Sequence, residues 1–544
     1  PERVTYHIVA RIVRATVTPI LHVCLSITVK RLFGLNKECG AEDASQIALL
    51  RRFINSRLLS KRKLKDAFAI VGTHYEVVSF VYRMMGAKIG RRVYWPGSGI
   101  YCQDPELLEI GDDVVFGSRS ELFTTDRFGT GKITIGAGAM IADRVVLLPG
   151  THVGHRTVMG SGALSKRDTS YEDNSVWMGN DRGEAICFSR GFPQTEKDDT
   201  ITPFGRAFYQ RKADYFVYPY IFVLFVNVFV SALSAAFWSI AAAVAAQLLR
   251  QLHIHFRHIG LFHGKWYTFG VLYGFIASCF IFMLSIQVIL ALLWVIVTKW
   301  IVIGRRQSGQ YHWDKSSYCQ RWQLHLTLSL PLYKGYGNGG VLAPLTGTVF
   351  IVWFYRALGA KIGRDCTIFP CGKPGLMTEP DLVELGDEVS LDHCSVVAHI
   401  NSRGNFALNA LKIGNGCALR AGSRLLSGAS MDDSSMLCEH TLLTSGEVAE
   451  AGQVYVGWPA RLIKSQETSD KGRNESSGKE IADKRLSTAL ICPLCRGFPK
   501  SSTGIPCGHV FCEADSTRKL TKLRLQMHKR LVEMPHMQGL VFQG

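Results

Sequence analysis

Apolar side chains recur at every sixth position in two stretches of this chain. A step of six is a multiple of the strand period of two, and it does not fit the helical period of about 3.6. This pattern is typical of short parallel strands that tight turns join into a prism, in which one aliphatic side chain of every six residues is buried in the interior. The repeated positions are Ile135, Ile141, Leu147, Val153 and Met159 in the first stretch, and Ile413, Leu419, Leu425, Met431, Leu437 and Leu443 in the second. The pattern therefore predicts two parallel β-helix domains.

The two stretches belong to an internal duplication. Residues 82–90 (YRMMGAKIG) recur as residues 355–363 (YRALGAKIG), and residues 105–112 (PELLEIGD) recur as residues 380–387 (PDLVELGD). Two shorter blocks follow in the same order in both halves, LLPG against LLSG and VWMG against VYVG. Blocks that match in one order indicate a repeated structural unit rather than chance.

Two long runs without a charged side chain separate the predicted prisms. Residues 215–249 form a run of 35 and residues 266–298 a run of 33, and a helix needs about 20 apolar residues to cross a bilayer. Each run is therefore predicted to span once. Basic residues on the outer flanks outnumber those in the connecting loop, which predicts cytoplasmic soluble domains. Residues 15–29 are apolar but short, and they are either the end of a truncated span or an interfacial helix.

Composition adds a charged surface to this picture. The chain has 62 Lys and Arg against 44 Asp and Glu, a net charge of +18. The basic residues cluster beside the apolar segments and do not alternate with aromatic ones, so a lipid bilayer is the expected partner and nucleic acid is not. The cysteines before residue 440 show no disulfide framework, which indicates reduced thiols. The chain opens on Pro1, and we expect a fragment or a processed product.

These patterns divide the chain into six parts. A membrane or interfacial segment (1–33) precedes the first β-helix domain (34–214), two transmembrane helices (215–304) and the second β-helix domain (305–463). A polar linker (464–488), predicted to be disordered, then leads to a cysteine-containing tail (489–544).

The second prism closes with the residues VYVGWPA at positions 454–460. This ending and the hexads resemble the hexapeptide-repeat acyltransferases, and the resemblance implies a left-handed parallel β-helix. Tandem prisms that alternate with membrane helices resemble, over residues 5–465, the C-terminal membrane region of single-module nonribosomal peptide synthetases similar to ε-poly-L-lysine synthetase. That resemblance implies an adenylation domain and a carrier domain upstream, and the joining of carrier-bound aminoacyl groups to an amine.

Acyl transfer needs a general base, for which histidine is the usual residue, and hydrogen-bond donors for the developing oxyanion, which turn amides supply. The apolar ladder of the second prism breaks between Val397 and Ile413, so a loop leaves the prism there, and His399 stands at its root. We therefore predict His399 as the base, with His393 as a second candidate. Arg403 in the loop is a candidate for the phosphate or carboxylate of a pantetheine carrier, or else a solvated surface arginine.

The ladder of the first prism breaks at a similar place, but without a histidine. The position of His399 corresponds to Thr124 when counted from the N-terminal side of the break, and to Glu121 when counted from the C-terminal side. The first prism is therefore either structural or uses Glu121 or Asp126 as a base.

The tail has the spacing of a zinc finger. Cys-x-x-Cys is followed after eleven residues by Cys-x-His-x-x-Cys, which resembles the first part of a RING finger. The candidate zinc ligands are Cys492, Cys495, Cys507, His509 and Cys512. The last Cys-x-x-Cys pair of a RING finger is missing. The tail is therefore interpreted as a partial zinc site, a ubiquitin-ligase module or a degenerate domain.

The sequence thus favours a membrane-bound acyl or aminoacyl transferase. It would take its acyl group from a phosphopantetheine carrier or from CoA and deliver it to an amine or a hydroxyl. The alternative is a non-catalytic β-helix scaffold anchored in the membrane. The faces of the prisms are candidates for oligomer contacts, or for packing against each other within one chain.

Overall fold

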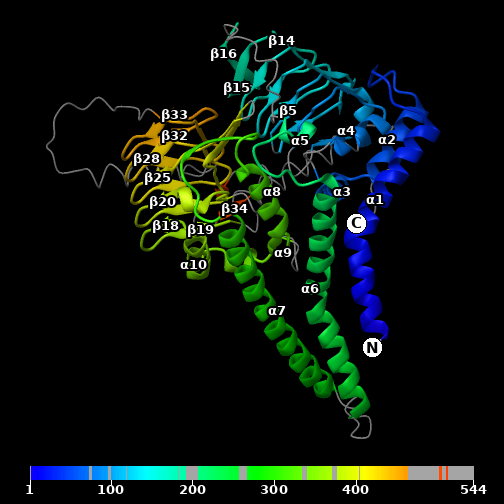
Figure 1. Cartoon of the computed structure of the whole chain (residues 1–544), viewed down its shortest axis with the longest axis vertical. Coiled ribbons are helices and arrows are strands. Elements are labelled where there is room, and N and C mark those ends of the chain that lie inside the picture. The colour runs from blue at the N-terminus through cyan, green and yellow to red at the C-terminus, as the bar shows by residue number, and fades with distance from the viewer. Residues whose placement is uncertain are drawn as a thin grey trace, which may run out of the picture. The chain divides into compact units, whose positions relative to one another are not determined.

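The computed structural model describes residues 2–72, 76–95, 100–117, 119–181, 183–191, 206–255, 266–333, 340–370, 376–402, 405–463, 502–504 and 510–512. The chain divides into two compact units, Pro1–Leu462 and Ile463–Gly544. The first unit contains both predicted prisms and the long apolar helices, and Figure 1 shows its elements.

The first prism has three faces, each a sheet of short parallel strands. The first sheet consists of β2 (Lys88–Ile89), β4 (Leu108–Ile110), β9 (Ile133–Ile135), β12 (His152–Val153) and β14 (Ser170–Tyr171). The second consists of β5 (Val115–Phe116), β10 (Met140–Ile141), β13 (Val158–Met159) and β15 (Val176–Asp181), with β16 (Glu184–Ser189) antiparallel at its edge. The third consists of β3 (Tyr101–Cys102), β6 (Glu121–Leu122) and β11 (Val146–Leu147).

The second prism repeats this arrangement. Its first sheet consists of β18 (Lys361–Ile362), β20 (Val383–Leu385), β25 (Leu411–Ile413), β28 (Ser430–Met431) and β31 (Val448–Ala449). Its second consists of β19 (Thr367–Phe369), β21 (Ser390–Asp392), β26 (Ala418–Leu419), β29 (Met436–Leu437) and β32 (Val454–Val456), with β33 (Arg461–Leu462) antiparallel at its edge. Its third consists of β22 (Ser395–Val396), β27 (Arg424–Leu425) and β30 (Leu442–Leu443).

The six-residue ladder forms the core of both prisms, as the sequence predicted. Leu419 lies opposite Leu437 in neighbouring parallel strands, so three steps of six complete one coil. Both side chains are fully buried. One corner of successive coils is closed by Gly416, Ser434 and Gly452, each in the left-handed region with φ between 59° and 67°. The predicted fold class, two parallel β-helix domains flanking a helical hairpin, is confirmed.

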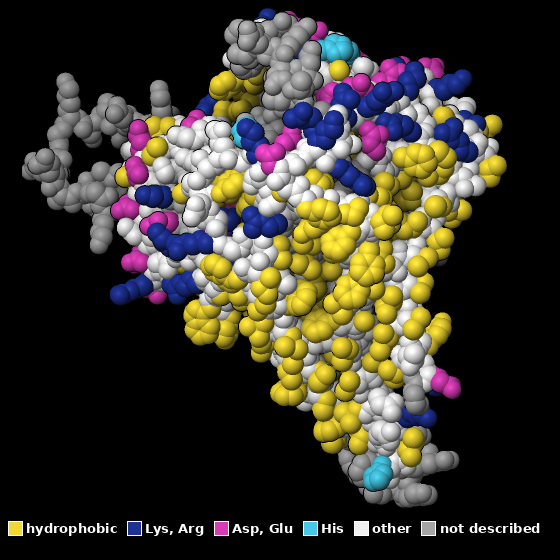
Figure 2. All heavy atoms as spheres, in the orientation of Figure 1, with side chains coloured by type: hydrophobic (Ala, Val, Ile, Leu, Met, Phe, Trp, Pro, Cys, Tyr) yellow, Lys and Arg dark blue, Asp and Glu magenta, His cyan; other side chains and the backbone are white. Residues whose placement is uncertain are grey.

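Within the described ranges, three helices are long and apolar enough to cross a membrane: α1 (Glu2–Phe33), α6 (Tyr220–His255) and α7 (Trp266–Val302). Figure 2 shows hydrophobic side chains covering much of their surface. The two predicted spans correspond to α6 and α7. The N-terminal segment, whose nature the sequence left open, is one continuous helix of 32 residues that packs along α6 (Figure 1).

Shorter helices connect the long helices to the prisms. Between α1 and the first prism lie α2 (Gln46–Leu58), α3 (Lys61–Val71) and α4 (Val77–Met84). The short helix α5 (Ala207–Gln210) precedes α6. Between α7 and the second prism lie α8 (Tyr318–Leu328), α9 (Leu330–Tyr333) and α10 (Val349–Ala357).

Each prism extends one antiparallel hairpin from its third face. In the first prism β7 (Thr125–Asp126) and β8 (Gly129–Thr130) form the hairpin, and β1 (Cys39–Gly40) adds a third strand to it. In the second prism β23 (His399–Ser402) and β24 (Asn405–Leu408) form the hairpin, and β17 (Gly309–His312) adds the third strand. Because β1 follows α1 and β17 follows α7, the repeated unit includes a long apolar helix as well as a prism.

A buried ion pair at the end of each long helix supports this extended duplication. Lys30 of α1 contacts Glu106 at 2.8 Å, and Lys299 of α7 contacts Asp381 at 3.1 Å. Glu106 and Asp381 occupy matching positions in the repeated block of residues 105–112 and 380–387. All four side chains are almost completely buried. The α1 helix is therefore the counterpart of α7 in the first copy.

The two prisms pack against each other within the first unit. The indole Nε1 of Trp458 donates to the carbonyl oxygen of Ser161 at 2.8 Å, and the backbone N–H of Asn180 donates to the carbonyl oxygen of Trp458 at 3.0 Å. Arg424 of the second prism forms an ion pair with Asp143 of the first. The closing motif of the second prism thus contacts the first prism.

Candidate active site

His399 lies where the hairpin leaves the second prism. Val396, at the end of β22, is the last ladder residue before the hairpin, and it lies opposite Leu425 in β27. The chain then turns away from the prism, and β23 begins at His399, opposite Leu408 in β24. Backbone pairing on β24 fixes the position of the histidine, although the residue belongs to a protruding loop.

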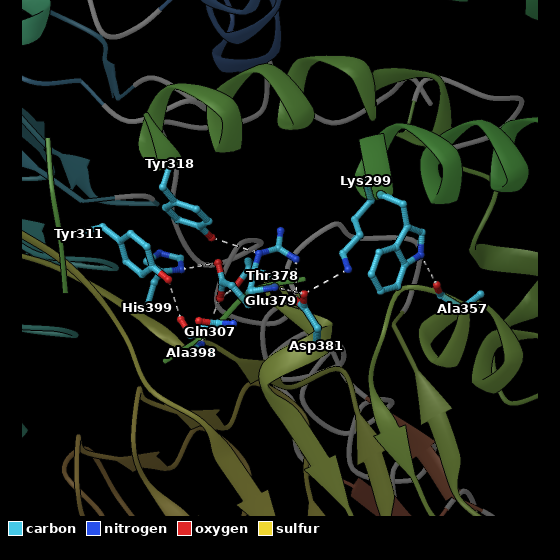
Figure 3. A network of polar contacts seen from close by, with 12 residues as sticks. Lys299, Gln307, Tyr311, Tyr318, Ala357, Thr378, Glu379, Asp381, Ala398 and His399 are labelled. Atoms are coloured by element: carbon cyan, nitrogen blue, oxygen red, sulfur yellow. Dashed lines mark hydrogen bonds and ion pairs between the residues drawn. The ribbon is translucent and has the colours of Figure 1, made fainter. Parts of the chain in front are cut away.

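A buried carboxylate orients the His399 ring. Nδ1 of His399 lies 2.8 Å from Oε1 of Glu379, whose side chain is fully buried. Glu379 directly precedes a short 3-10 helix (Pro380–Leu382), and it also accepts hydrogen bonds from the Thr378 hydroxyl and, at 3.2 Å, from the Ala398 backbone N–H. Figure 3 shows Thr378, Glu379, Ala398 and His399 converging in this way. Such contacts hold a carboxylate in one orientation and give a neighbouring imidazole one preferred tautomer.

The charge on Glu379 is stabilised by its surroundings. Burial alone would raise the pKa of this carboxyl, but the adjacent His399, the positive charge of Arg306 and the Thr378 hydroxyl lower it below its ordinary value. Glu379 is therefore ionised at neutral pH, and its Oε1 is an acceptor for a hydrogen bond from Nδ1–H of His399.

Aromatic rings enclose the other sides of His399. Phe406 stacks on the imidazole at 5.1 Å between ring centroids, and Trp322 of α8 meets it edge-on at 5.5 Å. About a fifth of the His399 side chain, 21%, stays accessible to solvent. Among the described residues none forms a hydrogen bond with Nε2. The candidate base is thus held on its Nδ1 side by Glu379 and stays partly exposed.

A second carboxylate connects the site to the end of α7. Asp381 accepts from Nη1 of Arg306 at 2.8 Å and contacts Nζ of Lys299 at 3.1 Å. Nε of Arg306 lies 3.1 Å from the Tyr318 hydroxyl. Lys299, Tyr318, Glu379 and Asp381 lie close together in Figure 3. The network places the guanidinium charge between the long helix and the His399–Glu379 pair.

The first prism has the same arrangement with a threonine in place of the histidine. Asp104 precedes the equivalent 3-10 helix (Pro105–Leu107) and accepts a hydrogen bond from the hydroxyl of Thr125, the first residue of β7, at 2.8 Å. Asn36 donates to the other oxygen of Asp104 at 2.8 Å. Thr125 therefore occupies the position of His399, and Asp104 that of Glu379.

This register corrects both alignments made from the sequence. Leu122 lies in the ladder as Val396 does, so the counterpart of His399 lies three residues later, at Thr125, and not at Thr124. Glu121 stands on the outer side of β6 and forms an ion pair with Lys61. The alignment counted from the N-terminal side failed because Val397 was taken as the last ladder residue, whereas the ladder ends at Val396.

Other predicted site residues lie apart from this pair or outside the described residues. Asp126 forms an ion pair with Arg167 at 2.7 Å. His393 occupies the turn between β21 and β22 with a φ of 49° and stays a second candidate. Arg403 lies outside the described residues, so its predicted contact with a carrier stays a prediction.

The zinc-finger prediction gains no support. Cys492, Cys495, Cys507 and His509 lie outside the described residues, and only the backbone of Cys512 is described, in β35 (Val510–Cys512), which pairs with β34 (Ser502–Gly504). Within the described ranges, no three or more His, Cys, Asp or Glu side chains are placed to hold a metal ion.

Glu379, the partner of the candidate base His399, was not predicted from the sequence. A signal was present, because an acidic residue directly precedes the repeated block in both copies, Asp104 before residues 105–112 and Glu379 before residues 380–387. The six-residue period gave no reason to connect this acid with the histidine twenty residues later, since the two meet only when neighbouring coils stack.

Comparison with known proteins places the chain among distant relatives. No family model matches it. It is 22% identical over 479 residues to a delta-poly-L-ornithine synthetase of Acinetobacter baumannii (strain AB307-0294), a match over 86% of this chain and 33% of the relative. The chain therefore spans about a third of the length of this relative, as a distant homologue of that part.

Several solved structures align with parts of the chain. A maltose O-acetyltransferase from Clostridium difficile 630 aligns over 21% of this chain and 74% of its own, with 15% identity and a TM-score of 0.16. A hexapeptide-repeat acetyltransferase from Vibrio cholerae aligns over 25% of this chain and 86% of its own, with 11% identity and a TM-score of 0.20. A galactoside acetyltransferase in complex with coenzyme A aligns over 23% of this chain and 74% of its own, with 15% identity and a TM-score of 0.19.

Proposed function

We propose that the second prism transfers an acyl or aminoacyl group to an amine or hydroxyl acceptor, with His399 as the general base. The observation that carries this proposal is the 2.8 Å contact between Nδ1 of His399 and the buried Glu379. An imidazole oriented by a carboxylate, with its second nitrogen open to the surroundings, is a recurring arrangement for general base catalysis.

In the proposed reaction the acceptor approaches Nε2 of His399 and attacks the carbonyl carbon of a thioester. His399 takes the proton that the acceptor nitrogen or oxygen loses as the new C–N or C–O bond forms. The carbon–sulfur bond then breaks, and the imidazolium returns its proton to the departing thiolate. Glu379 stabilises the imidazolium by its charge, and turn amides of the prism are the proposed donors to the oxyanion.

The resemblance to peptide synthetases favours an aminoacyl donor on a phosphopantetheine arm, with CoA as the alternative carrier. The distant relative is a poly-L-ornithine synthetase, which favours an amine as the acceptor. Both assignments are proposals for this chain, which spans about a third of that relative.

The test compares His399→Ala with Thr125→Ala. Both substitutions shorten the first side chain of a hairpin and break its contact with a buried acid, so they disturb the two prisms alike. The full chain in detergent is incubated with an aminoacyl-pantetheine thioester and an amine, and amide product is measured by mass spectrometry. We expect product to be lost in His399→Ala and kept in Thr125→Ala. Equal product formation in both variants would remove His399 from the reaction.

The first prism is proposed as a non-catalytic support. Its hairpin root carries Thr125, whose hydroxyl cannot serve as a base at neutral pH, hydrogen-bonded to Asp104. If both prisms are non-catalytic supports, the alternative function follows, which is a membrane-anchored scaffold that catalyses no acyl transfer. Wild-type chain that forms no amide product with either carrier-bound or CoA-bound donors would favour the scaffold.

A further inference from the structure

The helix α2 (Gln46–Leu58) has its apolar and polar faces reversed. A helix on the surface of a water-soluble protein turns its apolar side inward. In α2 the large apolar side chains face outward: Ile47 is 62% exposed, Leu50 53% and Phe53 58%. These side chains and Leu49 span about 160° of the helix circumference, at about 100° per residue.

The inward side of α2 is polar. Arg51 packs beside Gly34 at the end of α1, and Arg52 points its guanidinium to the sulfur of Cys39 at 3.7 Å. Asn55 is 5% exposed. Burying polar groups is unfavourable unless they are hydrogen-bonded, and exposing large apolar side chains to water is unfavourable as well. The reversed pattern is explained if the apolar side lies against hydrocarbon.

The charge of this region identifies the surroundings further. Residues 46–65, which cover α2 and the start of α3, contain seven basic residues and no acidic one. Among the described residues, Lys61 forms the one ion pair of this group, with Glu121. The seven are Arg51, Arg52, Arg57, Lys61, Arg62, Lys63 and Lys65. A basic segment with an exposed apolar helix face is suited to a surface of anionic lipid headgroups.

The position of α2 agrees with a lipid surface. It packs against α1, which is long and apolar enough to cross a membrane. Hydrophobic side chains on the long helices continue in Figure 2 towards the upper right, where Figure 1 places α2, and basic side chains lie next to them. The apolar surface of α2 therefore continues the surface that faces the bilayer.

We propose that α2 lies in the headgroup region of the bilayer that holds α1, α6 and α7, with Ile47, Leu50 and Phe53 among the lipid chains and its basic neighbours against anionic headgroups. The helix then works as a lateral support that fixes the first prism relative to the membrane surface. This proposal concerns binding to lipid and does not depend on the proposed catalytic activity.

The test uses two phenylalanines matched in exposure. Phe53 is 58% exposed with Arg57 over its ring, and Phe128, in the hairpin of the first prism, is 56% exposed with Arg127 over its ring. Each is replaced in turn by the photoreactive p-benzoylphenylalanine in the full chain. The variants are reconstituted into nanodiscs of phosphatidylcholine, with and without phosphatidylglycerol, and irradiated, and adducts are identified by mass spectrometry.

We expect lipid adducts at position 53 in severalfold excess over position 128, with more adduct when phosphatidylglycerol is present. Similar lipid adducts at both positions would overturn the proposal. Cross-linking of position 53 to a second copy of the chain would overturn it as well, because the apolar face would then be a protein interface. An equal yield in both lipid mixtures would overturn the preference for anionic headgroups.

Discussion

Replacing Glu379 by Gln should slow acyl transfer without unfolding the second prism. The substitution keeps the shape of the side chain but removes the charge that faces Nδ1 of His399 at 2.8 Å. In the proposed reaction His399 becomes an imidazolium, so the carboxylate stabilises the transition state more strongly than the ground state. Its loss should therefore lower kcat rather than raise KM.

The size of the effect follows from the hydrogen bond. A hydrogen bond to a charged partner contributes about 1.5–3 kcal/mol. If this energy acts only in the transition state, the rate falls about 10- to 150-fold, since about 1.4 kcal/mol corresponds to a factor of ten. The full burial of Glu379 favours the upper part of the range, because solvent does not screen the interaction.

The matched control is Asp104→Asn in the first prism. Asp104 occupies the same place and also contacts the root of a hairpin at 2.8 Å, but its partner Thr125 has no part in the proposed reaction. Turnover is measured with an aminoacyl-pantetheine thioester at saturating amine, and thermal unfolding is followed in parallel. Unchanged kcat in Glu379→Gln, or the same loss in Asp104→Asn, would refute the role assigned to Glu379.

Three further predictions concern stability, measured by thermal or denaturant unfolding of the full chain in detergent. Burial lowers the pKa of His325 to about 4. The unfolded chain therefore binds a proton at this histidine more tightly than the folded chain does. The free energy of unfolding should fall as the pH drops from about 6.5 towards 4, by about 2 kcal/mol at pH 5. His325→Leu should reduce this slope, and an unchanged slope would contradict the assignment. Lys30→Met should destabilise the chain by about 3–5 kcal/mol because it leaves Glu106 buried without its cation, and the double substitution with Glu106→Leu should recover much of the loss. Leu437→Ala should cost about 2–5 kcal/mol, since its side chain fills the core of the second prism, whereas Val448→Ala, at a half-exposed position, should change little.

The regular part of the fold was predictable because its cause is periodic. Leu419 and Leu437 are buried for the same reason, which is that every sixth side chain points into the prism. A single sequence shows such a rule many times, so one irregular step does not hide it. The duplicated blocks gave the number of prisms in the same way.

The candidate catalytic pair was predictable only in part because it depends on one contact across coils. His399 was found as an irregularity in the ladder, but its partner Glu379 belongs to the previous coil. The two residues are twenty positions apart, which is not a multiple of the six-residue step. Counting Val397 instead of Val396 as the last ladder residue placed the counterpart of His399 at Thr124 instead of Thr125.

The extent of the repeated unit was also hidden from the sequence. Helix α1 shows little similarity to α7, because lipid-facing side chains need only be apolar. The relation becomes visible at the helix ends, where Lys30 and Lys299 each reach a buried acid of the repeated block. The duplication of the long helix is therefore recognised from these specific polar contacts and not from the apolar surfaces of the two helices.

The comparison of the two copies suggests how the candidate catalytic pair relates to the fold. In the first prism Asp104 ties Thr125 to Asn36, so it joins the hairpin root to the segment that follows α1. An acid at this position therefore has a structural role that needs no histidine. In the second prism the same tie is made by His399, with the charge of Arg306 nearby in the place where the first copy has a neutral asparagine. Two residue differences at this contact, histidine for threonine and arginine for asparagine, thus distinguish the candidate active site of the second prism from the structural contact of the first. Matched variants in both prisms are therefore needed to separate the loss of this contact from the loss of the proposed base.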